Sequence, residues 1–147
     1  MKISSQAFKD NERIPKKYTC DGENINPPLD ISGVPENAKS LVLIMDDPDA
    51  PDGTWIHWVV FDITPKTTRI EEGSMPIDAI EAENSSGEVS YEGPCPPSGT
   101  HRYYFKLYAL DTKINLSAAE EKAKIDEEME EHILDYAETY GVYSRGN

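Results

Sequence analysis

The sequence predicts a mainly β fold in which several antiparallel strands carry a helical segment near the C-terminus. Two apolar runs, residues 41–45 and 55–61, meet at a short turn rich in aspartate and proline. A third run, residues 101–110, alternates apolar and amphipathic side chains. The regular alternation of strands and helices that builds a parallel sheet is not seen in the sequence. These three observations favour an antiparallel sheet with a helix packed on it.

The first two runs form the predicted centre of the fold, between Ser40 and Ile63. The run 41–45 is apolar at every position, which is typical of a strand covered on both faces. Because side chains alternate along a strand, Asp47 shares a face with Met45 and lies at the end of that strand. We therefore expect Asp47 at the mouth of whatever this face covers.

The second run places His57 on one face of its strand together with Val59 and Phe61, by the same alternation. The turn between the two runs contains Asp-Gly and returns the chain, so the end of one strand and the start of the next share an edge of the sheet. We therefore expect His57 to lie near Asp47 and Asp49.

The remaining strands are expected on both sides of this centre. The third central strand is predicted from His101 to Asp111, with His101 and Tyr103 leading an apolar, inward-pointing row. The region 74–92 has little periodicity and is expected to be mostly loop with a short strand or two. Shorter strands are predicted at Ile3 to Phe8, Leu29 to Ser32 and Thr68 to Glu72.

The helical segment is predicted after residue 116. Ser117 and Glu120 have the spacing of a capping box, which marks a helix start. Gly141 can end the helix, and whether the segment is one helix or a turn plus a longer helix stays open. His132, away from the other motifs, is expected on this helix in a structural or solvent-facing position. An apolar stripe recurs every four residues, at Ile125, Met129, Ile133 and Ala137.

Length and charge limit the classes of function. The 147 residues, 1–147, suit a single domain. Acidic residues number 28 against 14 basic ones, and a formal charge of −14 opposes binding to nucleic acid or to anionic membrane surfaces. No apolar run is long enough for a transmembrane segment, and the N-terminus lacks the apolar stretch of a secretory signal. The cytoplasm is therefore the expected location.

The two cysteines, Cys20 and Cys95, lie in loops rich in turn-forming residues. Their spacing indicates neither a zinc site nor a disulfide framework. They could approach each other in the fold, but for a cytosolic chain we expect reduced thiols.

Several types of site could in principle use the histidine and aspartate cluster. A calcium loop beginning at Asp47 fails, because Pro51 and Trp58 occupy positions that need oxygen ligands. A facial metal site would need two histidines and a carboxylate to converge. A cysteine or serine hydrolase using Cys95 or Ser98 lacks a nucleophile-elbow context.

An anion site is the remaining interpretation. Two imidazoles, a tyrosine hydroxyl and loop amides would converge on a small cavity, and Asp47 would accept from a histidine N–H to set its tautomer. No cofactor is expected, and enzyme activity is not indicated. A metal- or cysteine-dependent enzyme using the same cluster stays open as the alternative.

The sequence resembles the phosphatidylethanolamine-binding protein family, and in particular its short bacterial and archaeal branch, the Raf-kinase-inhibitor-like proteins. The motifs follow the order of the family between residues 19 and 110. They are Cys20-Asp21-Gly22 with Pro27-Pro28-Leu29, Asp47-Pro48-Asp49-Ala50-Pro51, Trp55-x-His57-Trp58, Gly93-Pro94-Cys95-Pro96-Pro97-x-Gly99 and His101-Arg102-Tyr103.

The resemblance implies two antiparallel sheets with Greek-key connections and a pocket for phosphate or phosphorylated head groups. Relatives include homodimers, kinase-binding proteins and serine protease inhibitors, so a homodimer and a kinase or protease partner are further expectations. The positions that match the pocket of the family are Asp47, Pro51, Trp55, His57, Pro96, His101 and Tyr103.

Overall fold

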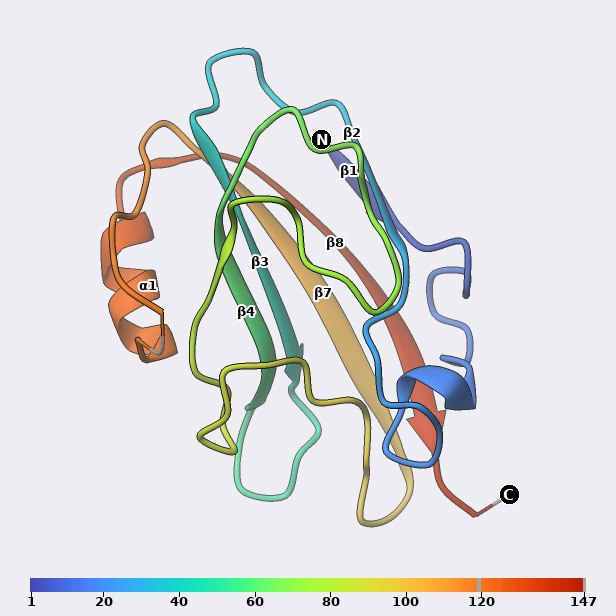
Figure 1. The fold of residues 1–147 in the computed structure, drawn as a ribbon. Coiled ribbons are helices and arrows are strands. Elements are labelled where there is room, and N and C mark those ends of the chain that lie inside the picture. The colour runs from blue at the N-terminus through green and yellow to red at the C-terminus, as the bar shows by residue number, and fades with distance from the viewer. Residues whose placement is uncertain (119, 147) are drawn as a thin grey trace.

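The computed structural model describes residues 1–118 and 120–146, and within them the chain forms two antiparallel sheets and one α-helix (Figure 1). The larger sheet has the strand order β6-β4-β3-β7-β8 and the smaller one β1-β2-β5. The mainly β fold with two antiparallel sheets is confirmed. The elements are β1 (Lys2–Ser4), the 3-10 helix η1 (Lys16–Tyr18), β2 (Leu29–Ser32), β3 (Ser40–Asp47), β4 (Trp55–Ile63), β5 (Arg69–Ile70), β6 (Ile80–Glu81), β7 (Thr100–Leu110), α1 (Lys122–Met129) and β8 (Ile133–Ser144).

The larger sheet is covered on both faces, as the apolar run of β3 predicted. Leu43 and Met45 pack towards the smaller sheet, whereas Val42 and Ile44 pack towards α1. Figure 1 shows α1 on one side of the larger sheet and β1 and β2 on the other. All residues of β3 are buried, so this strand is the centre of a three-layered molecule.

The predicted strands agree with the observed ones, apart from their lengths. The opening strand stops at Ser4, and the strand near residue 70 has only two residues. In the region expected to be mostly loop, β6 is the short strand. The inward row of β7 is confirmed, because Tyr103 and Phe105 are buried between the sheets.

The predicted face of His57 is wrong, and a β-bulge is the reason. Met45 lies opposite Trp58 and the next residue of β3 lies opposite Ile56, so His57 is an extra residue without a partner on β3. A bulge of this kind shifts the alternation by one position. Val59 packs towards α1, while His57 and Trp58 both face the space between the sheets.

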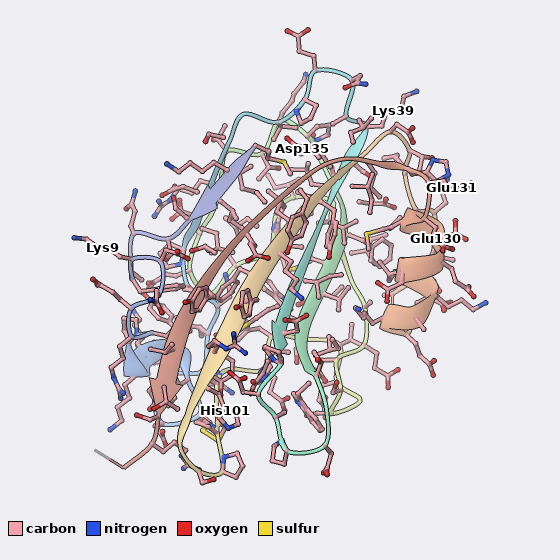
Figure 2. The ribbon with its side chains drawn as sticks, turned by 180° about the vertical axis from the view of Figure 1, so that it is seen from behind. Lys9, Lys39, His101, Glu130, Glu131 and Asp135 are labelled. Carbon is pink, nitrogen blue, oxygen red and sulfur yellow. A yellow bond between two sulfur atoms is a disulfide. The ribbon has the colours of Figure 1, made fainter. Side chains whose placement is uncertain are left out.

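The prediction of a long C-terminal helix is also wrong beyond the second turn of that helix. Ile125 and Met129 are buried against the sheet, as the apolar stripe predicted. The helix ends there, Glu131 has a positive φ of 66°, and the chain continues as β8 (Figure 2). The capping box does not start the helix, because α1 begins at Lys122.

The residues of β8 explain why this segment is a strand and not a helix. From residue 139 onward its side chains alternate between buried and half-buried, with Thr139, Gly141 and Tyr143 inward. Tyrosine, threonine and valine fit the pleated surface of a sheet better than a helix. Gly141 therefore lies inside a strand rather than at a helix end.

Two further observations complete the fold. His132 lies in the connection between α1 and β8, where its Nδ1 donates to Asp111 Oδ1 over 2.7 Å, instead of on the helix. In the part of the chain that is described, no helix is long and apolar enough to cross a membrane.

Candidate functional site

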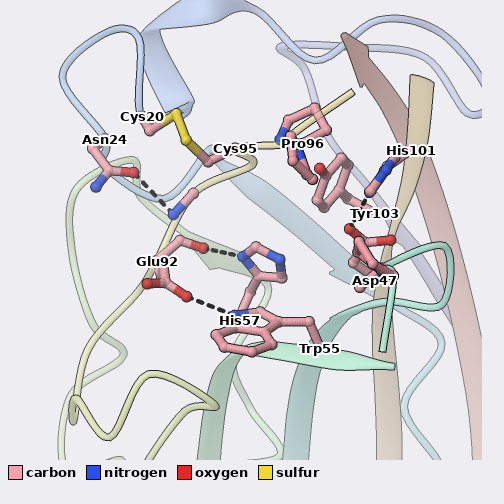
Figure 3. Close-up of a pocket in the computed structure, with 14 residues that line it drawn as sticks. Cys20, Asn24, Asp47, Trp55, His57, Glu92, Cys95, Pro96, His101 and Tyr103 are labelled. Atoms are coloured by element: carbon pink, nitrogen blue, oxygen red, sulfur yellow. Dashed lines mark hydrogen bonds and ion pairs between the residues drawn. A yellow bond between two sulfur atoms is a disulfide. The ribbon is translucent and has the colours of Figure 1, made fainter. Parts of the chain in front are cut away.

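A cavity of about 350 Å³ opens where β3 ends and where β4 and β7 begin (Figure 3). The structure gathers all seven residues named from the sequence around this one cavity. These lining residues are Asp47, Pro51, Trp55, His57, Pro96, His101 and Tyr103.

Asp47 orients one of the two histidines. Its Oδ2 accepts a hydrogen bond of 2.7 Å from Nδ1 of His101, and its Oδ1 accepts one of 2.8 Å from the backbone N–H of Asp49. Both carboxylate oxygens are therefore occupied by donors from the protein. Because a carboxylate can only accept, Nδ1 of His101 carries a proton and Nε2 is the ring nitrogen left for a ligand.

A backbone carbonyl orients the other histidine. The Nδ1 of His57 donates to the carbonyl oxygen of Glu92 over 2.6 Å, and the backbone N–H of Glu92 donates to the carbonyl oxygen of His57 over 3.0 Å. The carbonyl likewise requires a proton on Nδ1. His57 therefore carries its proton on the same ring nitrogen as His101. Among the described residues, its Nε2 has no hydrogen-bond partner.

Burial decides the charge of His57. Only 5% of this residue is exposed, and burial lowers the pKa of its imidazole below the ordinary value, although the Glu92 carbonyl opposes the shift. The ring is neutral at pH 7. A neutral Nε2 offers a lone pair, so it must gain a proton before it can donate to an anion.

Tyr103 stands between the two imidazoles. The His57 ring meets it edge-on with centroids 5.3 Å apart, and the His101 ring is stacked at 6.3 Å. Its hydroxyl is buried and, among the described residues, has no hydrogen-bond partner of good geometry. Burial, and then the charge of Asp47, raise the pKa of this hydroxyl, so it keeps its proton. An uncharged donor is thus held in the wall of the cavity.

The rim of the cavity is apolar. Trp55 is 40% exposed, and its indole Nε1 donates to Oε1 of Glu92 over 2.8 Å. Pro51 is exposed at the turn between β3 and β4, and Pro96 is buried in the loop that precedes β7. An apolar rim with a few polar groups in the wall is the usual composition of a small-molecule site.

The residues that position the histidine of β4 were not predicted from the sequence. Glu92 binds His57 through its backbone and Trp55 through its side chain, while Oδ1 of Asn24 accepts from the Gly93 N–H over 2.9 Å. The position of Glu92 directly before the Gly-Pro-Cys-Pro-Pro segment was the available signal. Its partners lie too far away in the chain for spacing to reveal them.

The expectation of reduced cysteines is wrong. Cys20 and Cys95 form a disulfide with an S–S distance of 2.08 Å, and both residues line the cavity and are exposed. The hydrogen bond of 3.1 Å from the Cys20 N–H to the carbonyl oxygen of Pro94 brings the two loops together. Spacing along the chain could not predict this pairing, because it depends on tertiary contacts between segments 75 residues apart.

Asp49 has a structural role beside the cavity. Its carboxylate binds the guanidinium and the backbone N–H of Arg102, with a shortest distance of 2.8 Å. These hydrogen bonds lower the pKa of Asp49 to about 2. The pair fastens the turn after β3 to β7.

The metal and cysteine alternatives can be compared with this geometry. Among residues 1–118 and 120–146, no three histidine, cysteine or acidic side chains gather as metal ligands would. Cys95 has no free thiol while it is bonded to Cys20. The arrangement offers hydrogen-bond donors and imidazole lone pairs within an apolar rim.

Comparisons with known proteins agree with the fold. The family profile described as phosphatidylethanolamine-binding protein matches residues 4–144. A UPF0098 protein of Methanothermobacter thermautotrophicus is 52% identical, with 99% of this chain and 100% of that protein aligned. A second UPF0098 protein, from Chlamydia trachomatis, is 45% identical, with 99% of each chain aligned.

Two solved structures are also similar. A crystal structure of a phosphatidylethanolamine-binding protein homologue from Chlamydia trachomatis has a TM-score of 0.95 at 44% identity, covering 99% of this chain and 97% of the other. YbcL of E. coli has a TM-score of 0.92 at 30% identity, covering 99% and 98%. On this profile match, these identities and the shared fold, the chain belongs to the phosphatidylethanolamine-binding protein family.

Proposed function

We propose that the cavity binds a small anion, either free phosphate or the phosphoryl group of a small molecule, without catalysing a reaction. The observation that carries this proposal is the buried hydroxyl of Tyr103, a residue that lines the cavity, because this hydroxyl has no hydrogen-bond partner of good geometry among the described residues. A buried donor without an acceptor costs about 1 to 3 kcal/mol, and an anion in the cavity would remove that cost.

The two histidines supply the rest of the anion site in this proposal. Among the described residues, Nε2 of His57 and Nε2 of His101 have no hydrogen-bond partner, and each becomes an N–H donor once its ring is protonated. Charged donors bind a phosphate more strongly than neutral ones. Anion binding should therefore be accompanied by proton uptake, with His57 as the group that is neutral beforehand.

The positions of the carboxylate and the cysteine favour binding over catalysis. Asp47 uses one lone pair of each oxygen to hold His101 and the backbone of Asp49, which gives this carboxylate a positioning role in the proposed site. Cys95 is joined to Cys20 and has no thiolate to offer. A cysteine-dependent reaction would first require reduction of this disulfide.

The test is calorimetric titration of the metal-free protein with inorganic phosphate and with phosphoethanolamine. Saturable binding is expected for the wild type and should be lost in a His57→Ala/His101→Ala variant. The control is His132→Ala. This histidine is also hydrogen-bonded to an aspartate, Asp111, but lies at the other end of β7 from the cavity. Repeating the titration in buffers of different ionisation enthalpy measures the proton uptake.

Three results would contradict the proposal. The folded wild type failing to bind either compound would remove the anion site. Equal binding by the double-histidine variant would place the anion elsewhere. Turnover of phosphoethanolamine during the titration, lost with the histidines, would make the site catalytic.

The cytoplasmic location expected from the sequence remains a proposal, and the disulfide makes it testable. Disulfides persist mainly in oxidising compartments, with intracellular proteins of hyperthermophiles as an exception. Thiol alkylation in intact cells, followed by mass spectrometry of Cys20 and Cys95, would measure their redox state where the protein works.

A further inference from the structure

A second cavity, of about 560 Å³, lies beside the first and has a different character. Figure 1 shows η1 beside the C-terminal end of β8, and residues of both elements line this cavity. Three cationic side chains line it, Arg13, Lys16 and Arg145, with one carboxylate, Asp21. In a chain of formal charge −14, a cavity lined by three cations and one acid is a local reversal of sign.

The charge of the single carboxylate is already compensated by its neighbours. Asp21 accepts from the Tyr143 hydroxyl over 2.7 Å and from Arg145 over 2.9 Å. These two partners lower the pKa of Asp21, so it stays ionised and bound to them. Among the described residues, Asp21 forms an ion pair with Arg145 but none with Arg13 or Lys16, although the charge of Lys16 also helps to keep the pKa of Asp21 low.

Arg13 is placed to receive an anion. The other three arginines, Arg69, Arg102 and Arg145, each pair with a carboxylate, whereas Arg13 has no carboxylate partner among the described residues. Its guanidinium carbon lies over the Tyr143 ring, 4.6 Å from the centroid, and the guanidinium donates to the carbonyl oxygen of Ser144 over 3.3 Å. Both hydrogen bonds of this guanidinium, to Ser144, use the same nitrogen, so its other donors remain available for a planar or tetrahedral anion.

The two cavities share a wall. Pro97 lines both of them, and Cys20 lines the first while its neighbour Asp21 lines the second. A ligand that crosses Pro97 would place one end beside the two imidazoles and the other beside Arg13 and Lys16. The spacer between the two ends would lie on exposed proline and disulfide atoms.

We infer that the Arg13 cavity is a second anion site and that the ligand of this protein is a small molecule with two anionic groups. The inference rests on the proposed function for its first group, a phosphoryl held by the histidines. The second group is a phosphate or carboxylate held by Arg13 and Lys16. A short spacer joins the two groups.

The test uses alkanediol bisphosphates with spacers of increasing length, each compared with the alkyl monophosphate of the same length. At low ionic strength, one spacer length should bind at least about tenfold more tightly than its monophosphate. An Arg13→Gln/Lys16→Gln variant should lose this advantage and bind the monophosphate as the wild type does.

The control variant is Lys39→Gln/Lys113→Gln, which makes the same change in charge. Lys39 lies at the end of the sheet opposite to His101 (Figure 2), and Lys113 follows β7 at that same distant end. The advantage of the bisphosphate should survive in this control. Loss of the advantage in both variants would mean that net charge alone attracts the ligand, which would overturn the inference.

Failure of this inference is separable from failure of the proposed function. If monophosphates bind but no bisphosphate binds more tightly, the second site is refuted and the histidine site stands. If no monophosphate binds, the histidine site is refuted. The second site is then judged by backbone NMR: bisphosphate should shift the amides of Arg13 and Arg145, and unshifted amides would refute it as well.

Discussion

Removal of the Cys20–Cys95 disulfide is expected to destabilise the protein strongly while leaving its fold in place. The perturbation is the Cys20→Ser/Cys95→Ser variant, studied beside the reduced wild type. The two cysteines are 75 residues apart, and closing a loop of that length in the unfolded chain is worth about 4.5 kcal/mol in the chain-entropy relation. Removal of a native disulfide from a small domain typically costs about 2 to 5 kcal/mol, so we expect a loss of about 3 to 4 kcal/mol.

The fold should survive because other contacts join the same two loops. Tyr91 donates through its hydroxyl to the carbonyl oxygen of Tyr18 over 2.7 Å, and the Gly93 N–H donates to Asn24 over 2.9 Å. These hydrogen bonds do not depend on the sulfur atoms. The loops should therefore stay in contact, although more loosely, and phosphate should bind more weakly.

The assay is urea unfolding followed by far-UV circular dichroism. Both the serine variant and the reduced wild type should unfold at lower urea than the oxidised wild type, with a melting temperature lower by roughly 10 °C. The reduced wild type is the control for the substitution itself, because it keeps the native side chains. Coincident unfolding curves for the oxidised and the reduced wild type would refute the reasoning. A loss of stability seen only in the serine variant would mean that the substitution disturbs packing and that the disulfide itself contributes little.

Three other predictions concern single groups. Tyr103→Phe removes a buried hydroxyl without a hydrogen-bond partner of good geometry among the described residues, so the ligand-free protein should become more stable by about 1 to 3 kcal/mol while calorimetry finds phosphate binding about tenfold weaker. Burial lowers the pKa of His57, so affinity for sulfate, whose charge is constant, should rise as pH falls from about 7.5 to about 5.5, and less steeply in His57→Ala. Gly141→Ala would place a Cβ 2.5 Å from Ile14 and 2.9 Å from Phe8, and should cost about 1 to 3 kcal/mol in urea unfolding.

Each of these has a result that would contradict it. A Tyr103→Phe protein that loses several kcal/mol of stability would mean that the hydroxyl has a structural partner. A sulfate affinity independent of pH would mean that a protonated imidazole does not bind the anion. An unchanged unfolding midpoint for Gly141→Ala would mean that the contact with Ile14 can relax.

The sign of the His57 effect follows from its surroundings. In the folded, ligand-free protein the ring resists protonation, whereas in the unfolded chain it titrates near its ordinary value of about 6.5. The stability of the ligand-free protein should therefore fall as pH drops below about 6.5 and level off once the folded ring is also protonated. A bound anion favours the protonated ring, so it should reduce this loss.

The C-terminal segment illustrates a limit of periodicity. An apolar residue every four positions is compatible with a helix, and for Ile125 and Met129 the prediction was correct. From residue 133 the same apolar positions belong to a strand, where the alternation of Thr139, Gly141 and Tyr143 decides which side chains are inward. Strand propensity and alternation together were a stronger signal there than the apolar stripe alone.

The sequence by itself determined the mainly β fold, the central strands and the gathering of Asp47, His101 and Tyr103 at one edge. Alternation along a single strand is a local property, so it can be predicted without knowing the neighbouring strands. The orientation of His57 and the Cys20 disulfide were decided only by the tertiary structure. A bulge depends on the register of two strands, and a disulfide depends on which loops meet. Neither is encoded in the spacing of residues along one segment.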